Sequence, residues 1–103
     1  MVVFERWNSD RDGVLTESGL RKKLEGRGCR VSRYVYAPGT SFPDHSHSTD
    51  KIDAVVSGRF LMAAEGRQFL LEAGDMIVLP RGTVHSAEVV GTEQVVSLDG
   101  SKA

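Results

Sequence analysis

Three histidines are the residues of this 103-residue chain whose type and spacing best suit chemistry. His45 and His47 are separated by one residue, so on a β-strand both imidazoles would point to one face, about 6–7 Å apart at the backbone. His85 follows the turn at 80–82 and falls on a different predicted strand. Three neutral imidazoles that converge on one point suit a late first-row divalent metal and leave coordination positions open. The sequence therefore predicts a metal site at His45, His47 and His85.

The elements that must position these side chains are predicted by glycines, which recur every eight or nine residues from Gly58 to Gly100. Between them lie segments rich in Val, Ile, Leu and Phe: residues 52–56, 59–64, 68–72, 76–79, 83–90 and 93–98. Short strands at this spacing are typical of an antiparallel sandwich or barrel, where inward-facing side chains of neighbouring strands meet at one mouth. We expect a single domain over residues 1–103, with the barrel in residues 39–103.

The N-terminal part, residues 1–38, is predicted to hold a short strand near Val2, a helix over 16–25 and a longer strand over 30–37. Thr16 is a suitable N-cap for the helix. Leu20 and Leu24 lie four residues apart and give the helix one apolar edge, and Gly26 is a natural C-terminal stop.

Two motifs include all three histidines. The first is Gly39-x5-His45-x-His47-x10-Gly58, and the second is Gly74-x5-Pro80-x-Gly82-x2-His85. Together they resemble the two sequence motifs of the cupin superfamily. The resemblance implies an all-β fold, a small double-stranded β-helix (jelly-roll) barrel, here with one short N-terminal helix. It also implies that His45, His47 and His85 correspond to the metal ligands of the family, with Zn, Fe, Ni, Mn or Cu as the divalent ion.

The chain departs from this pattern at the position seven residues before Gly58, where the family has a glutamate ligand and this sequence has Lys51. An ammonium group is repelled by a divalent cation and offers it no lone pair. Three interpretations follow. The three histidines bind metal alone while Lys51 points outward; Asp53 or Asp50 supplies the missing carboxylate; or no metal binds and the histidines line a polar pocket. A second departure is Val89, where the family often has asparagine.

The pocket beside the histidines is predicted to include Lys51 and Asp53, with Phe60, Met62 and Met76 as its apolar lining. Plain barrel core is the alternative interpretation for the three apolar residues, because small barrels fill their interior with side chains. Asp44 and Asp50 flank the two neighbouring histidines and are candidates to orient their rings.

Two functions are compatible with these residues. One is a metal-dependent enzyme that acts on a small organic molecule, as an oxygenase or an isomerase. The other is a non-enzymatic module that binds or senses a small organic anion, with the Lys51 ammonium paired to the carboxylate of the ligand. The fold alone does not choose between them, because one fold hosts many chemistries.

Composition excludes other classes of partner. A net charge of −1 and a pI of 6.3 give no general attraction to nucleic acid or to an anionic membrane. The basic residues at 21–23 are interpreted as the solvated face of the helix. The single cysteine cannot form an internal disulfide, and we find neither a signal peptide nor a long apolar run, so a cytoplasmic location is expected.

A homodimer is also predicted. A chain of this size buries only a modest share of its surface, so a partner subunit would add stability. Val2, Val3, Phe4 and Trp7 are the residues expected to add a strand to a neighbouring protomer, unless they close their own barrel.

Overall fold

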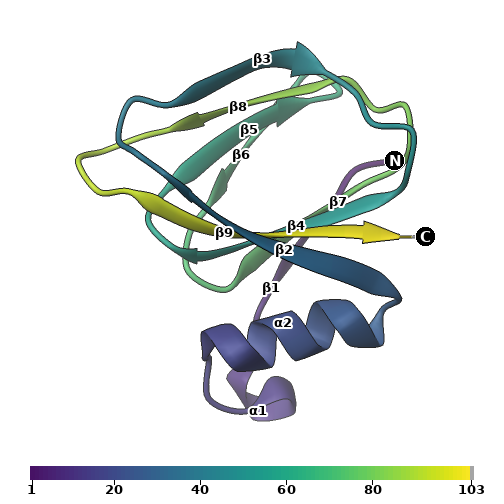
Figure 1. Ribbon diagram of the computed structural model, residues 1–103, viewed down its shortest axis with the longest axis vertical. Helices are drawn as coiled ribbons and strands as arrows, with labels where there is room; N and C mark the ends of the chain where they lie inside the picture. The colour runs from purple at the N-terminus through teal and green to yellow at the C-terminus, as the bar shows by residue number, and fades with distance from the viewer. Residues whose placement is uncertain (103) are drawn as a thin grey trace.

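Two antiparallel β-sheets face each other in the computed structural model, which describes residues 1–102 (Figure 1). The five-stranded sheet has the order β1-β7-β4-β9-β2, and the four-stranded sheet has the order β3-β8-β5-β6. The first sheet consists of β1 (Val3–Arg6), β7 (Asp75–Leu79), β4 (Lys51–Ser57), β9 (Val95–Lys102) and β2 (Cys29–Tyr36). The second consists of β3 (Ser41–His45), β8 (His85–Val89), β5 (Phe60–Ala64) and β6 (Arg67–Leu71). The predicted all-β jelly-roll barrel is confirmed.

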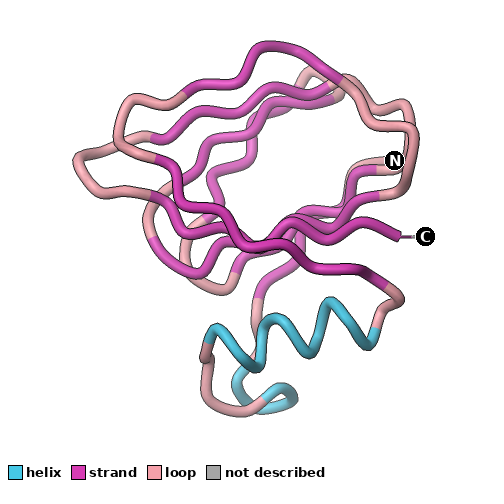
Figure 2. Tube along the Cα trace, in the orientation of Figure 1, coloured by secondary structure: helices cyan, strands magenta, loops and turns pink. Residues whose placement is uncertain are grey.

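The space between the sheets is filled by one of two apolar clusters. Its buried members come from both sheets and from the chain start: Val2, Val55, Phe60, Met62, Ala64, Leu71, Ile77, Leu79, Ala87, Val89 and Val95. Side chains alternate across a strand, so the odd-numbered residues of β4 face this interior and the even-numbered residues face away. The open centre of the trace in Figure 2 is the region that these inward side chains occupy.

The second cluster lies on the outer face of the five-stranded sheet, where helix α2 (Glu17–Gly26) packs (Figure 1). Leu20 and Leu24 are fully buried there, which confirms the predicted apolar edge of the helix. Thr16 caps the helix as predicted, because its Oγ1 accepts a hydrogen bond from the Gly19 N–H at 2.9 Å. The structure adds a short helix that the sequence did not predict, α1 (Ser9–Asp12), which is capped by the side chain of Asn8.

Glycines from both motifs occupy turns of the chain. Gly58 has a φ of +86°, and a Cβ at this position would collide with the carbonyl oxygen of Gln94. Gly82 has a φ of +80° in the turn that precedes β8. Both positions require glycine, since an L side chain is strained at such a φ. The two strands that follow these turns, β5 and β8, pair side by side in the four-stranded sheet.

The N-terminal strand belongs to its own barrel. β1 pairs with β7 in the register Val3 to Val78, and Val2 is only 2% exposed inside the apolar cluster between the sheets. In the part of the chain that the structure describes, β1 is an edge strand of the five-stranded sheet. The homodimer stays a prediction. Within residues 1–102, neither helix has the length and apolar character needed to span a bilayer.

Candidate metal centre and its cavity

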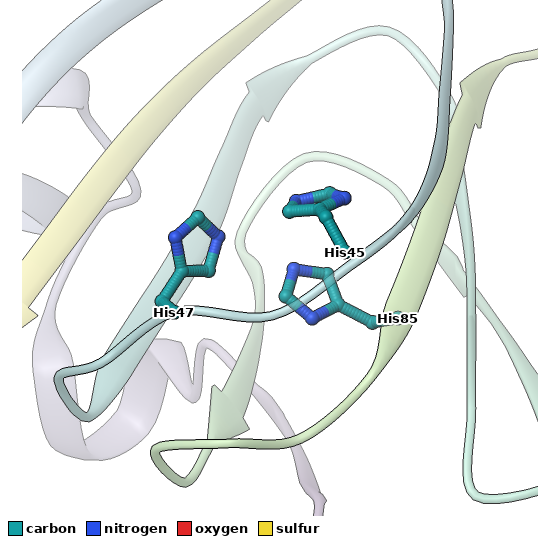
Figure 3. Close-up of side chains that lie close together, drawn as sticks. All are labelled: His45, His47 and His85. Atoms are coloured by element: carbon teal, nitrogen blue, oxygen red, sulfur yellow. The ribbon is translucent and has the colours of Figure 1, made fainter.

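The three histidines meet at one end of the barrel, with their rings turned toward one another (Figure 3). His45, the last residue of β3, is the direct antiparallel partner of His85, the first residue of β8. The centroids of these two rings lie 4.2 Å apart. His47 lies in the loop two residues beyond β3, not on the strand as expected, and its ring centroid is 5.0 Å from His45 and 5.2 Å from His85.

The loop that holds His47 is attached to the turn of the second motif. The Gly82 N–H donates to the carbonyl oxygen of His47 at 2.9 Å. The Arg81 N–H donates to Oδ1 of Asp50 at 2.8 Å, a bond that lowers the pKa of this carboxyl. The two motifs are therefore joined by hydrogen bonds beside the site. Asp50 serves this junction, so the structure gives no support to its interpretation as the missing metal ligand.

Backbone carbonyls fix the orientation of two of the rings. Nδ1 of His45 lies 2.8 Å from the carbonyl oxygen of Pro43, and Nδ1 of His85 lies 2.9 Å from that of Thr83. A carbonyl oxygen only accepts, so each Nδ1 must carry the proton and each Nε2 keeps its lone pair. We expected Asp44 or Asp50 to orient a ring, but the carbonyl groups of Pro43 and Thr83 orient His45 and His85.

Burial favours the neutral form of the histidines, which is the form that binds metal. His85 is 3% exposed, and burial is the main reason that its pKa is lowered. The pKa of His47 is also lowered, first by burial and then by the nearby Lys51 ammonium and the other two histidines. Both rings are therefore neutral at neutral pH, without help from a metal.

The donor set fits a divalent transition metal. One ring nitrogen from each of His45, His47 and His85 lies within 4.8 Å of the others. Small side-chain rotations would bring these atoms to the separation of about 3.0–3.4 Å that metal–nitrogen bonds of about 2.1 Å require. Three histidines occupy three positions, so further positions are left for water or a ligand.

Lys51 is buried beneath this site and points inward. Its side chain forms an ion pair with Oδ1 of Asp99, and its Nζ lies 3.9 Å from Oδ1 of Asp53. Lys51 is 6% exposed and is not among the residues that line the cavity in the described chain. The prediction that Lys51 belongs to the pocket lining is therefore wrong, and so is the interpretation in which its side chain points outward. Its ammonium is held by two carboxylates and so is not presented to the carboxylate of a ligand.

Asp53 faces the cavity from the middle strand of the five-stranded sheet. The residue is 9% exposed, and its Oδ1 has no hydrogen-bond partner among residues 1–102. Burial raises the pKa of Asp53 to about 6, although Lys51, His45 and the Gly100 N–H all act to lower it. The inward direction expected for Asp53 is what the structure has, and its carboxylate lies on the wall of the cavity that also holds the histidines.

A cavity of about 250 Å³ opens beside the histidines. Phe60 and Met62 line it together with Asp53, as the sequence predicted. Met76 does not: it is fully buried on the opposite face of the sheet, in the cluster that contains Leu20 and Leu24. Side chains alternate along this strand, and the prediction assigned Met76 to the wrong face. Its neighbour Ile77 is the residue that faces the barrel interior.

Sequence reasoning missed five residues of the lining: Tyr36, Phe42, Ala87, Ser97 and Asp99. Tyr36 packs edge-on against Phe42, with ring centroids 4.9 Å apart, and stacks on Phe60 at 5.6 Å. Ser97 and Asp99 could have been predicted from the alternation of side chains in β9, where Val95, Ser97 and Asp99 share a face. This signal identifies an inward face only once β9 is known to pair with β4.

Comparison with known proteins agrees with this fold. The model of the cupin domain matches residues 32–100, which is more than half of the chain. The chain therefore belongs to the cupin family. A search of curated proteins finds no match.

Several solved structures share the fold. KdgF from Halomonas sp. is 25% identical, with a TM-score of 0.59 over 71% of this chain and 79% of its own. A Cupin 2 conserved barrel domain protein from Salinispora arenicola CNS-205 is 23% identical, with a TM-score of 0.65 over 99% of this chain and 76% of its own. Oxalate decarboxylase is 27% identical, with a TM-score of 0.65 over 73% of this chain, but that match spans 22% of its own chain.

Proposed function

We propose that this cupin binds one divalent transition metal ion through His45, His47 and His85 and uses the open coordination positions to act on a small organic molecule. The observation that carries the proposal is the convergence of the three ring nitrogens at the edge of a cavity. The proposed ion is Zn, Fe, Ni, Mn or Cu, all of which accept imidazole ligands.

The residues around the ion would have different roles. The carbonyls of Pro43 and Thr83 hold His45 and His85 with Nε2 available. The aromatic side chains of Tyr36 and Phe60 exclude water from one side of the cavity and bind the apolar part of the ligand. A bound ion supplies Lewis acidity or, for a redox-active metal, electron transfer.

The proposed reaction class is an oxygenase or an isomerase reaction on a small organic acid or aromatic compound. Open positions on a three-histidine centre allow a substrate to bind next to the ion, which both classes require. Oxalate decarboxylase, a similar structure, is named for an organic acid. A non-enzymatic binding module is the second candidate, and the cavity beside the histidines favours it equally. Turnover of any bound organic acid would separate the two.

Metal analysis of protein purified without an affinity tag tests the proposal. We expect about one equivalent of divalent metal, or uptake of one equivalent of Co²⁺ by metal-free protein, with the visible spectrum of a nitrogen-ligated ion. His47→Ala should weaken Co²⁺ binding by about 100-fold or more, because one of three protein ligands is lost. Ser48→Ala, an exposed neighbour in the same loop, is the matched control and should bind like the wild type. Failure of the wild-type protein to bind any of the five metals would refute the proposal.

A further inference from the structure

We propose that a bound metal ion reverses the charge preference of the cavity: metal-loaded protein binds a small organic anion, whereas metal-free protein rejects that anion and binds an organic cation. The inference rests on the proposed metal site and specifies which class of ligand the site takes in each state. It follows from the charged side chains on the cavity lining and from the one that is buried beside them.

Two carboxylates, and no lysine or arginine side chain, line the cavity in the described part of the chain. They belong to Asp53 on β4 and Asp99 on β9, which are direct partners across the two strands. His47 and His85 add no positive charge at neutral pH, because burial lowers their pKa values. An organic anion that enters without a metal ion therefore meets like charge and finds no cationic side chain to bind it.

The Lys51 ammonium offsets only part of this negative charge. It forms an ion pair with Asp99, and its Nζ lies 3.9 Å from Oδ1 of Asp53. Two carboxylates and one ammonium group leave this charged cluster with one net negative charge. Lys51 is 6% exposed and is absent from the lining, whereas 27% of the Asp99 side chain is exposed. A ligand therefore contacts carboxylate and not ammonium.

Aromatic rings strengthen the preference of the metal-free cavity for a cation. Tyr36, Phe42 and Phe60 all lie on the lining, and the ring centroid of Tyr36 is 4.9 Å from that of Phe42 and 5.6 Å from that of Phe60. The face of an aromatic ring attracts a positive charge, and groups of such rings bind quaternary ammonium ions. Three rings and two carboxylates on one cavity favour an organic ammonium ion.

A divalent ion bound by the histidines would reverse this preference. The donor atoms that converge within residues 1–102 belong to three imidazoles and include no carboxylate oxygen. Neutral ligands leave the ion its two positive charges, so the ion and the charged cluster together carry one net positive charge. The histidines line the same cavity as the two aspartates, so this charge acts on any ligand there. An open coordination position then accepts the carboxylate of an organic anion.

Two probes of opposite charge test the inference at about pH 8, where Asp53 is ionised because its pKa is about 6. Benzoate and phenyltrimethylammonium each carry one ring, which suits a cavity of about 250 Å³. The quaternary ammonium group can neither lose a proton nor coordinate a metal. Metal-free and Co²⁺-loaded protein are titrated with each probe by calorimetry. We expect Co²⁺ to strengthen the binding of benzoate by about tenfold or more and to weaken that of phenyltrimethylammonium by a similar factor.

Asp99→Asn tests whether the lining carboxylates cause the preference of the metal-free protein. This substitution removes the net negative charge of the cluster, so the metal-free variant should bind phenyltrimethylammonium about tenfold more weakly than the wild type. Ser97→Ala, an uncharged change on the same lining, is the matched control and should bind both probes as the wild type does. If Asp99→Asn fails to fold, the affinities of the wild-type protein for the two probes decide the matter.

The outcomes separate this inference from the proposed metal site. If no Co²⁺ spectrum forms, the metal site is refuted and the reversal with it. A normal Co²⁺ spectrum with an unchanged affinity for either probe, or with neither probe bound by either form, overturns the reversal and leaves the metal site intact. Metal-free protein that binds benzoate as tightly as phenyltrimethylammonium overturns it as well.

Discussion

The two faces of the five-stranded sheet have opposite characters, although the same strands build both. On the outer face Ile52, Ala54 and Leu98 pack with helix α2 in a fully apolar layer. On the inner face, at the barrel mouth, neighbouring positions of β4 and β9 hold Lys51, Asp53 and Asp99. Strand alternation makes this possible, since each residue faces opposite to the next. The outer face stabilises the sheet, which allows the inner face to hold buried charges that cost stability.

Loss of the buried Lys51 ammonium should have the largest effect on the free energy of unfolding, because it leaves two carboxylates on the inner face without their counter-charge. Lys51→Met leaves Asp53 and Asp99 without their shared cation, and breaking a buried ion pair in this way costs about 3–5 kcal/mol in free energy of unfolding. Urea denaturation of the metal-free protein measures this. Lys22→Met, on the exposed face of α2, should change stability by less than about 0.5 kcal/mol. Equal effects of the two substitutions would mean that the buried pair does not matter for folding.

Damage to the outer face should lower stability and leave the chemistry intact. Leu24→Ala removes a fully buried side chain from the layer between α2 and the sheet, at a cost of about 2–4 kcal/mol. The affinity for Co²⁺, measured well below the melting temperature, should stay within about twofold of wild type, because this cluster lies on the face of the sheet opposite to the one that faces the barrel interior. A large loss of metal affinity would show that the two faces are not independent.

The free energy of unfolding should depend on pH through Asp53, a buried carboxyl on the inner face of the sheet. Its pKa of about 6 in the folded chain lies above the ordinary value of 3.8, so the folded state binds the proton more tightly than the unfolded state. Stability from this group is full below about pH 4 and is lost as the pH rises through about 6, by about 2–3 kcal/mol in total. His47 and His85 act in the opposite direction: their lowered pKa values remove stability as the pH falls below about 6.5.

Asp53→Asn isolates the carboxyl contribution from that of the histidines. The difference in free energy of unfolding between Asp53→Asn and wild type should shift in favour of the variant between pH 4 and pH 7, by about 2–3 kcal/mol. Metal-free protein is used at each pH, and the two urea curves are compared point by point. A difference that stays constant with pH would show that Asp53 titrates as an exposed carboxyl does.

The two faces also differed in how well they could be predicted. Leu20 and Leu24 follow from helical periodicity, and the histidine cluster follows from a fixed spacing, since barrel closure brings His85 across from His45. Asp99 carries no local signal, because it gains its role only through the pairing of β9 with β4. Met76 was misplaced for the same reason, since a shift of one residue moves a side chain to the other face.

The smallest expected effect concerns the end of α2, at the margin of the outer face. Thr16→Ala removes the Oγ1 that accepts from the Gly19 N–H and should cost about 1 kcal/mol in free energy of unfolding. Thr16→Ser keeps an oxygen at the same place and should recover most of that loss. Thermal denaturation of the two variants side by side measures the difference, and Co²⁺ binding should be unchanged in both. If serine and alanine were equally destabilising, the loss would come from the methyl group of Thr16, and packing against the sheet would then determine where this helix begins.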